Sequence, residues 1–140
     1  MSLPPPLPLD ETAQQHALDE LIGVEPVFSK VIDTSGPPPL WQREESFGSL
    51  VKIILEQQVS LASAQAAYDK LRATVTEVTP DTFLRLTDDQ LRTIGFSRQK
   101  TSYGRNLAQA MSEGELELAR LRTCSDNEVR SSLTAIKGIG

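Results

Sequence analysis

The sequence predicts an all-α fold, and three observations support this prediction. Apolar side chains recur every three or four residues, the spacing that gives a helix one apolar face. Helix-capping residues precede these stripes and glycines follow them, while no long stretch alternates with the period of two typical of a strand. We therefore expect about eight helices with short connections. Four of the stripes lie within residues 47–55, 61–75, 103–111 and 129–136.

Two runs of proline divide the first 45 residues. Residues 4–8 contain four prolines, which favour an extended backbone, so residues 1–9 are expected to form a Pro-rich tail. Apolar residues around Leu18 and Leu21, and again over residues 27–32, predict two helices within residues 10–45. Trp41 follows three prolines, and we expect it to anchor the chain against the later helices. Residues 46–140 form the predicted main helical domain.

Start and stop signals place the later helices. Thr79 precedes Pro80 in the pattern of an N-cap followed by a proline in the first turn. Two other hydroxyl residues stand three positions before Gln or Glu, as in a capping box, and two glycines stand where helices would end. These signals are Thr87 with Gln90, Ser125 with Glu128, Gly95 and Gly114.

The charge distribution gives a mixed indication about nucleic acids. The net charge of −5 argues mildly against a nucleic-acid binder. However, residues 1–60 carry three Lys/Arg against nine Asp/Glu, whereas residues 61–140 carry eleven against ten. Arg92, Arg98, Lys100 and Arg105 form a basic strip that no acid interrupts. A solvated helix face would explain this strip equally well.

Other features indicate a cytoplasmic protein that does not bind membranes. No apolar run approaches the roughly 18 residues of a membrane span, and the first residues lack the positive start of a signal peptide. Cys124 is the only cysteine, so it has no partner for a disulfide within the chain, and we interpret it as a small apolar residue. The single histidine, His16, has no partner pattern, and Tyr68 and Tyr103 lie on apolar stripes as expected of core residues.

The last eight residues form a helix that runs into a G-x-G turn at Gly138, Ile139 and Gly140. Glycines permit positive φ and leave space beside the backbone, so successive N–H groups can converge on an anion. With a second helix following, such a hairpin would bind a DNA phosphate and position the duplex without reading its sequence. A simple helix C-cap would use the same residues.

Residues 53–60 form a second distinctive feature, in which an apolar helix ends in Gln57 and Gln58 and Ser60 can cap the next helix. Paired glutamines at a helix–helix corner commonly cap the local backbone. The functional alternative is a side chain that enters the base stack and holds it open.

These features occur together in a longer resemblance. Residues 46–140 resemble bacterial 3-methyladenine DNA glycosylase II, within the helix-hairpin-helix DNA glycosylase superfamily. The matching pieces keep the order of the family. They are Phe47 with Leu50-Val51, residues 53–60 (IILEQQVS), Pro80 with Phe83-Leu84, residues 91–100 (LRTIGFSRQK), residues 114–118 (GELEL) and residues 136–140 (IKGIG).

The resemblance implies two helical subdomains around a cleft that binds double-stranded DNA with alkylated bases. Members of this family flip an alkylated purine out of the duplex and hydrolyse its N-glycosidic bond, without a metal or other cofactor in the chemistry. The resemblance places Gln58 at the wedge position, where a side chain fills the gap left by the flipped base. Gln57 and Ser60 are expected to support that corner. It also implies that the turn made by Lys137, Gly138, Ile139 and Gly140 contacts phosphate.

The sequence departs from the family at its end. The resemblance implies that a second hairpin helix and a loop with the catalytic aspartate would follow Gly140, and the 140 residues contain neither. We assign no catalytic residue here, and neither Asp126 nor Glu128 matches the expected position. This polypeptide alone is therefore expected to be inactive. The second helix would cover Ile136, Ile139 and Leu133, so we also expect the polypeptide either to self-associate through this face or to remain only marginally folded.

Two alternatives to a glycosylase stay open at this point. One is a non-catalytic helix-hairpin-helix module that binds the DNA backbone. The other is an all-α interaction domain that keeps only the shape of the family.

Overall fold

The computed structural model describes residues 9–140, so the proline run at residues 4–8 lies outside the described part of the chain. The described residues form nine helices and no strand, which confirms the all-α prediction. The chain divides into two compact units, Met1–Arg43 and Glu44–Gly140. No helix within residues 9–140 is long and apolar enough to cross a membrane.

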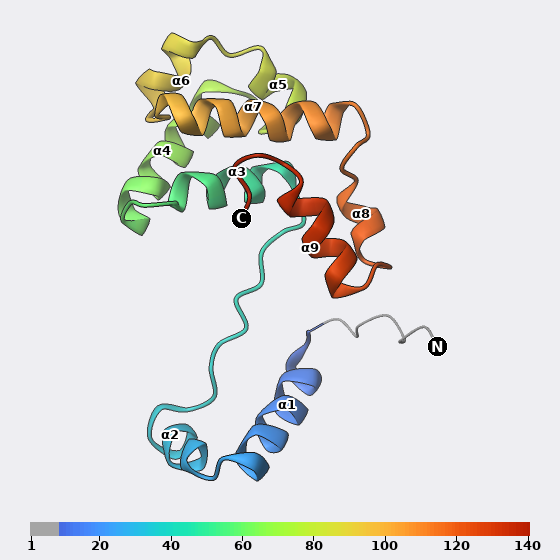
Figure 1. The fold of residues 1–140 in the computed structure, drawn as a ribbon. Coiled ribbons are helices and arrows are strands. Elements are labelled where there is room, and N and C mark those ends of the chain that lie inside the picture. Colours follow the sequence, from blue (N-terminus) through green and yellow to red (C-terminus); the bar gives the residue numbers. More distant parts are fainter. Residues whose placement is uncertain (1–8) are drawn as a thin grey trace. The chain divides into compact units, whose positions relative to one another are not determined.

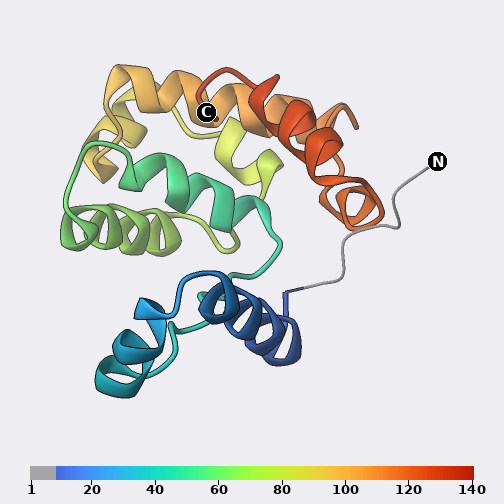
Figure 2. The same cartoon turned by 60° about the horizontal axis from the view of Figure 1, so that its bottom comes forward.

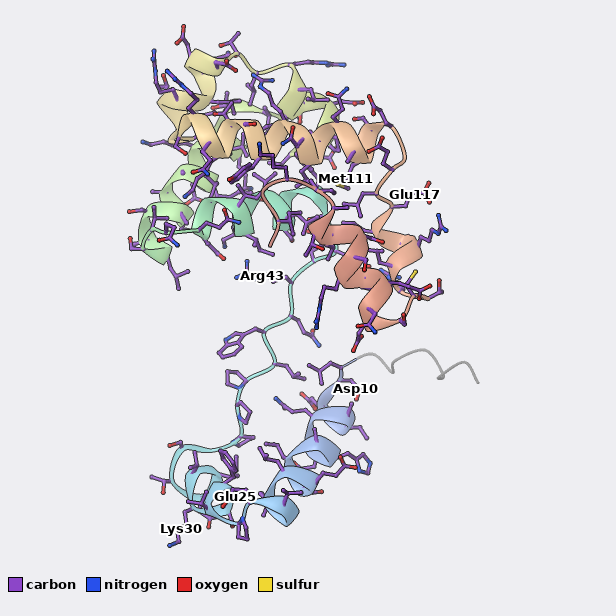
Figure 3. The ribbon with its side chains drawn as sticks, viewed as in Figure 1. Asp10, Glu25, Lys30, Arg43, Met111 and Glu117 are labelled. Atoms are coloured by element: carbon purple, nitrogen blue, oxygen red, sulfur yellow. The ribbon has the colours of Figure 1, made fainter. Side chains whose placement is uncertain are left out.

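The N-terminal unit contains α1 (Glu11–Val24) and α2 (Val27–Ser35), the two helices predicted there. Asp10 begins α1 by accepting a hydrogen bond from the backbone N–H of Ala13 at 2.8 Å, and Glu25 ends it (Figure 3). Neither helix contains a buried residue. This unit therefore has no closed core of its own among the described residues.

Trp41 belongs to the N-terminal unit, and its side chain is 84% exposed. Its expected anchoring against the later helices stays a prediction, because those helices belong to the other unit. Residues 37–44 form no helix, because prolines 37–39 remove backbone donors and favour an extended chain.

The C-terminal unit contains seven helices, of which α3, α5 and α6 pack against α7. Figure 1 shows α7 with α5 and α6 on one side and α3 on the other, and both Figure 1 and Figure 2 show α4 alongside α3. The helices are α3 (Phe47–Glu56), α4 (Leu61–Thr74), α5 (Pro80–Leu84), α6 (Asp88–Ile94), α7 (Arg98–Ser112), α8 (Leu118–Leu121) and α9 (Asp126–Thr134).

The predicted caps set most of these helix ends. Thr79, Thr87 and Ser125 each form a complete capping box, and the Thr79 box uses Thr82, which the sequence analysis did not identify. Gly95 ends α6 with φ 125°, and Gly114 has φ 77° two residues after α7. The one-turn helix α8 was not predicted, since four residues are too few to show a helical period.

The core of this unit forms where the predicted stripes meet. Its centre is the Phe83 ring of α5, which packs edge-to-face against Phe47 at 5.7 Å and against Phe96 at 5.4 Å between ring centroids. Gly104 of α7 lies against the far edge of that ring. The fully buried residues around it include Val51, Leu71, Leu91 and Leu107.

The apolar stripe that ends at Ile136 is more buried than the sequence analysis expected. Ile136 is only 8% exposed, and Leu133 and Ile139 are partly buried against the same core. Figure 3 labels Met111 near the C-terminal end of α7, and this side chain also packs against the core. The apolar face expected to drive self-association is therefore largely covered by the described residues themselves.

We predict that Gly104→Ala destabilises this unit, because the new Cβ would lie 2.5 Å from the Phe83 ring. The ring is held by Phe47 and Phe96, so it cannot move away freely. Overpacking should cost more than the gain in helix propensity, which leaves a net loss of about 1 to 2 kcal/mol. Denaturant unfolding followed by circular dichroism measures this. Ser102→Ala, an exposed change on the same helix, is the control and should stay within about 0.5 kcal/mol of wild type.

Candidate nucleic-acid interface

The corner between α3 and α4 presents Gln58 to solvent. Helix α3 ends at Glu56, Gln57 is its C-cap, and the Ser60 hydroxyl starts α4 by accepting from the Ser63 N–H at 3.2 Å. Between these fixed ends the side chain of Gln58 is exposed. The predicted cap at Ser60 is confirmed.

Gln58 has an unusual backbone conformation. Its φ of 60° makes it the only non-glycine residue with positive φ within residues 9–140. This left-handed conformation brings Cβ close to the backbone and costs about 1 to 2 kcal/mol for an L-residue. Strain of this kind persists only where the surrounding structure holds it, and it occurs frequently at functional sites.

The turn after α9 brings backbone N–H groups to the surface. The N–H of Ile136 donates to Leu133 O and that of Ile139 donates to Ile136 O, both within the turn. The N–H groups of Gly138 and Gly140 make no hydrogen bond to another described backbone group. Gly138 has φ 110°, and a Cβ at this position would overlap the Tyr103 ring. Only glycine lets the turn approach α7 this closely.

The structure brings the corner and the turn together, although they are 81 residues apart. Gln57 Nε2 donates to Gly138 O at 2.9 Å, and Asn106 Nδ2 donates to Lys137 O at 3.4 Å. The chain after α9 accordingly passes α3 in Figure 1 and lies beside α7 in Figure 2. The Lys137 side chain is exposed. The side chain of Gln57 is thus hydrogen-bonded within the chain. The exposed side chain of Gln58 can instead contact another molecule.

Two residues of α7 that the sequence analysis did not assign to the site also lie here. Lys100 Nζ donates to Leu55 O at 2.6 Å, and burial lowers the pKa of this ammonium group. The Tyr103 ring lies beneath Gly138, and its hydroxyl accepts from Gln99 Nε2 at 2.6 Å. For Tyr103 the available signal was the spacing of residues 99, 103 and 106, which share one face of a predicted helix.

The basic strip offers less free positive charge than its residue count suggests. Arg92 pairs with Asp89 at 2.8 Å, and Arg105 pairs with Asp88 at 2.7 Å while also donating to Leu86 O. Arg92, Arg98 and Arg105 all line an open groove of about 620 Å³ between α6 and α7. Two of the four basic side chains of the strip are therefore already paired with carboxylates of the same chain.

Glu128, the acid nearest the turn in the sequence, has a structural role. The Glu128 carboxylate accepts from the Ser125 hydroxyl and N–H at 2.7 Å each, and the hydroxyl bond followed by the backbone bond lowers its pKa. It is therefore ionised near neutral pH and occupied as a helix cap. Within residues 9–140, no cluster of His, Cys, Asp or Glu could hold a metal ion.

Comparison with known proteins identifies the family. Residues 51–140 match the family described as HhH-GPD superfamily base excision DNA repair protein. An endonuclease III of Sulfolobus acidocaldarius is 32% identical over 98 residues, which cover 67% of this chain and 42% of that protein. This chain thus spans less than half the length of that curated relative.

Two solved structures share the fold. The crystal structure of a DNA-3-methyladenine glycosidase from Bacillus halodurans aligns with TM-score 0.75 and 30% identity, over 86% of this chain and 56% of that one. A Schizosaccharomyces pombe 3-methyladenine DNA glycosylase in complex with abasic DNA aligns with TM-score 0.76 over 89% of this chain and 64% of that one. At 22% identity, the second likeness concerns the fold alone.

The expected family rested on the corner motif, the G-x-G turn and the order of the pieces between them. The family match covers both the corner and the turn, and the structural alignments extend over most of the chain. This chain belongs to the HhH-GPD superfamily of base excision DNA repair proteins.

Proposed function

We propose that this chain forms the base-extruding and backbone-binding part of a DNA glycosylase that removes alkylated purines such as 3-methyladenine. The observation that carries the proposal is the juxtaposition of a strained, exposed glutamine with a turn in which the N–H groups of Gly138 and Gly140 donate to no backbone carbonyl among the described residues. The Gln57–Gly138 hydrogen bond joins the two. The substrate class is supported by the name of the Bacillus halodurans structure, a DNA-3-methyladenine glycosidase with 30% identity to this chain.

The proposed roles follow from the cost of extruding a base. Unstacking and unpairing a nucleotide costs a few kcal/mol, so a protein that does this must stabilise the opened duplex. Gln58 would fill the gap in the stack, where its amide can also hydrogen-bond to the base left unpaired. The N–H groups of Gly138 and Gly140 would hold a phosphate beside that gap, which fixes the register of the duplex.

The chemical step needs little beyond this arrangement and one negative charge. Alkylation gives the purine a positive charge and makes it a good leaving group, so the reaction mainly requires stabilisation of the sugar cation that develops. The resemblance places the aspartate for this role after the second hairpin helix. We propose that the 140 residues supply extrusion and positioning and that residues beyond them supply the charge.

DNA binding by the 140-residue chain should be weak and strongly dependent on salt. Phosphate contacts release counterions, and about two such contacts would lower the affinity about tenfold between 50 and 200 mM salt. Fluorescence anisotropy with a labelled duplex that contains an abasic site measures this. Equal affinity at both salt concentrations would contradict the assignment of the turn as a phosphate site.

Excision tests the substrate class. Duplexes that contain 3-methyladenine or 7-methylguanine are incubated with the 140-residue chain and with the product of the whole reading frame that encodes it, and abasic sites are counted. We expect release of both bases by the whole product and none by the 140 residues. Binding without release by the whole product would instead support a non-catalytic module. Release by the 140 residues would mean that one of their own acids acts as the catalytic group.

Changes at Gln58 should separate its proposed role from its backbone strain. In the whole product, Gln58→Ala should slow excision of a normally paired damaged base about tenfold, and of a mismatched one much less, because the mismatched base is already partly unstacked. Gln58→Gly should show the same selective loss while melting higher than Gln58→Ala, because glycine accepts positive φ without strain. Equal slowing on both substrates would remove the wedge assignment.

A further inference from the structure

Helix α7 contacts both parts of the proposed interface from one side. Near its start, Lys100 Nζ donates to Leu55 O in the last turn of α3. Two turns later, Asn106 donates to Lys137 O, and Tyr103 between them supports Gly138. The corner and the turn are therefore both attached to a single helix, in addition to the direct bond from Gln57.

Lys100 satisfies a specific requirement of the corner. The last carbonyl groups of a helix have no partner within it and carry partial negative charge. Leu55 O is one of these groups, and the chain must leave α3 just beyond it to give Gln58 its positive φ. A partly buried ammonium 2.6 Å from this oxygen fixes the direction in which the chain leaves the helix.

Gln57 extends this restraint to the turn. Its backbone N–H donates to Ile54 O as the C-cap of α3, while its side chain donates to Gly138 O. A shift of the corner would therefore break the bond to the turn, and a shift of the turn would pull on the residue that precedes Gln58.

We propose that Lys100 and Gln57 are positioning residues that hold the corner and the turn as one unit, so that insertion of Gln58 and capture of the phosphate occur together. This inference rests on the proposed function for its DNA contacts. Its structural part, the coupling of the two segments, can be measured without DNA.

The first test measures coupling in the 140-residue chain by hydrogen–deuterium exchange. Lys100→Met keeps the apolar stem and removes the donor, and Gln57→Met keeps the length of the side chain and removes the amide. Among residues 57–60 and 137–140, the amides of Gln57 and Ile139 are hydrogen-bonded to backbone carbonyl groups, so these two amides report the coupling. We expect Lys100→Met to speed exchange at both of them, and Gln57→Met to speed it at Ile139. Lys100→Arg, which keeps a donor, should restore most of the protection. Lys70→Met, at an exposed lysine of α4, is the matched control.

The second test measures the preference for an abasic duplex over a fully paired one, as the ratio of the two dissociation constants. Both duplexes offer the same phosphates, but only the abasic one accepts Gln58 without unstacking a base. Lys100→Met and Gln57→Met should each reduce the preference about fivefold or more. A residue that only stabilises the fold would weaken binding to both duplexes equally.

The outcomes separate the inference from the proposed function. Wild-type exchange at the Ile139 amide in both Met variants would overturn the coupling, whatever the DNA result. A wild-type chain that binds neither duplex would contradict the proposed function and leave the exchange data to decide the coupling. If Lys100→Met fails to fold, the Gln57→Met variant decides both measurements, because its change lies at the partly exposed corner.

Discussion

The close approach of residue 138 to the Tyr103 ring sets the geometry of the whole interface. This contact requires a residue without Cβ, and Gly138 also adopts a positive φ there. Because the turn can lie directly on α7, its carbonyl groups come within reach of Gln57 and Asn106. The N–H groups of Gly138 and Gly140 then donate to no backbone carbonyl within residues 9–140. One small residue thus decides both where the turn lies and which of its groups stay available.

The core of the C-terminal unit supplies the rigidity on which this geometry depends. Phe83 packs between Phe47 and Phe96 and over Gly104, which ties α3, α5 and α7 together. The same helices carry the corner and the side chains that hold the turn. Strain at Gln58 can persist because both ends of its short segment are fixed, by Lys100 at Leu55 O and by the Ser60 cap. A chain with weaker packing here would let the corner relax.

The sequence predicted local features well and tertiary ones poorly, for physical reasons. Caps such as Thr87 and Ser125 act on amides only three residues away, so their spacing is visible in the chain. Lys100 was assigned only to a charged strip, because its partner is a backbone carbonyl 45 residues away. Ile136 was expected to be covered only by a second hairpin helix, but it is already buried in the core of the C-terminal unit.

The central claim is that the corner and the turn act as a single DNA-binding unit. A titration of the ¹⁵N-labelled chain with an abasic duplex tests it most directly, because NMR reports every backbone amide separately. The chemical shifts of the amides of residues 57–60 and 138–140 should change together during the titration and give one common dissociation constant. The chemical shifts of the amides in α1 and α2 should not change. Shifts confined to one of the two segments, or different dissociation constants for the two, would contradict the account.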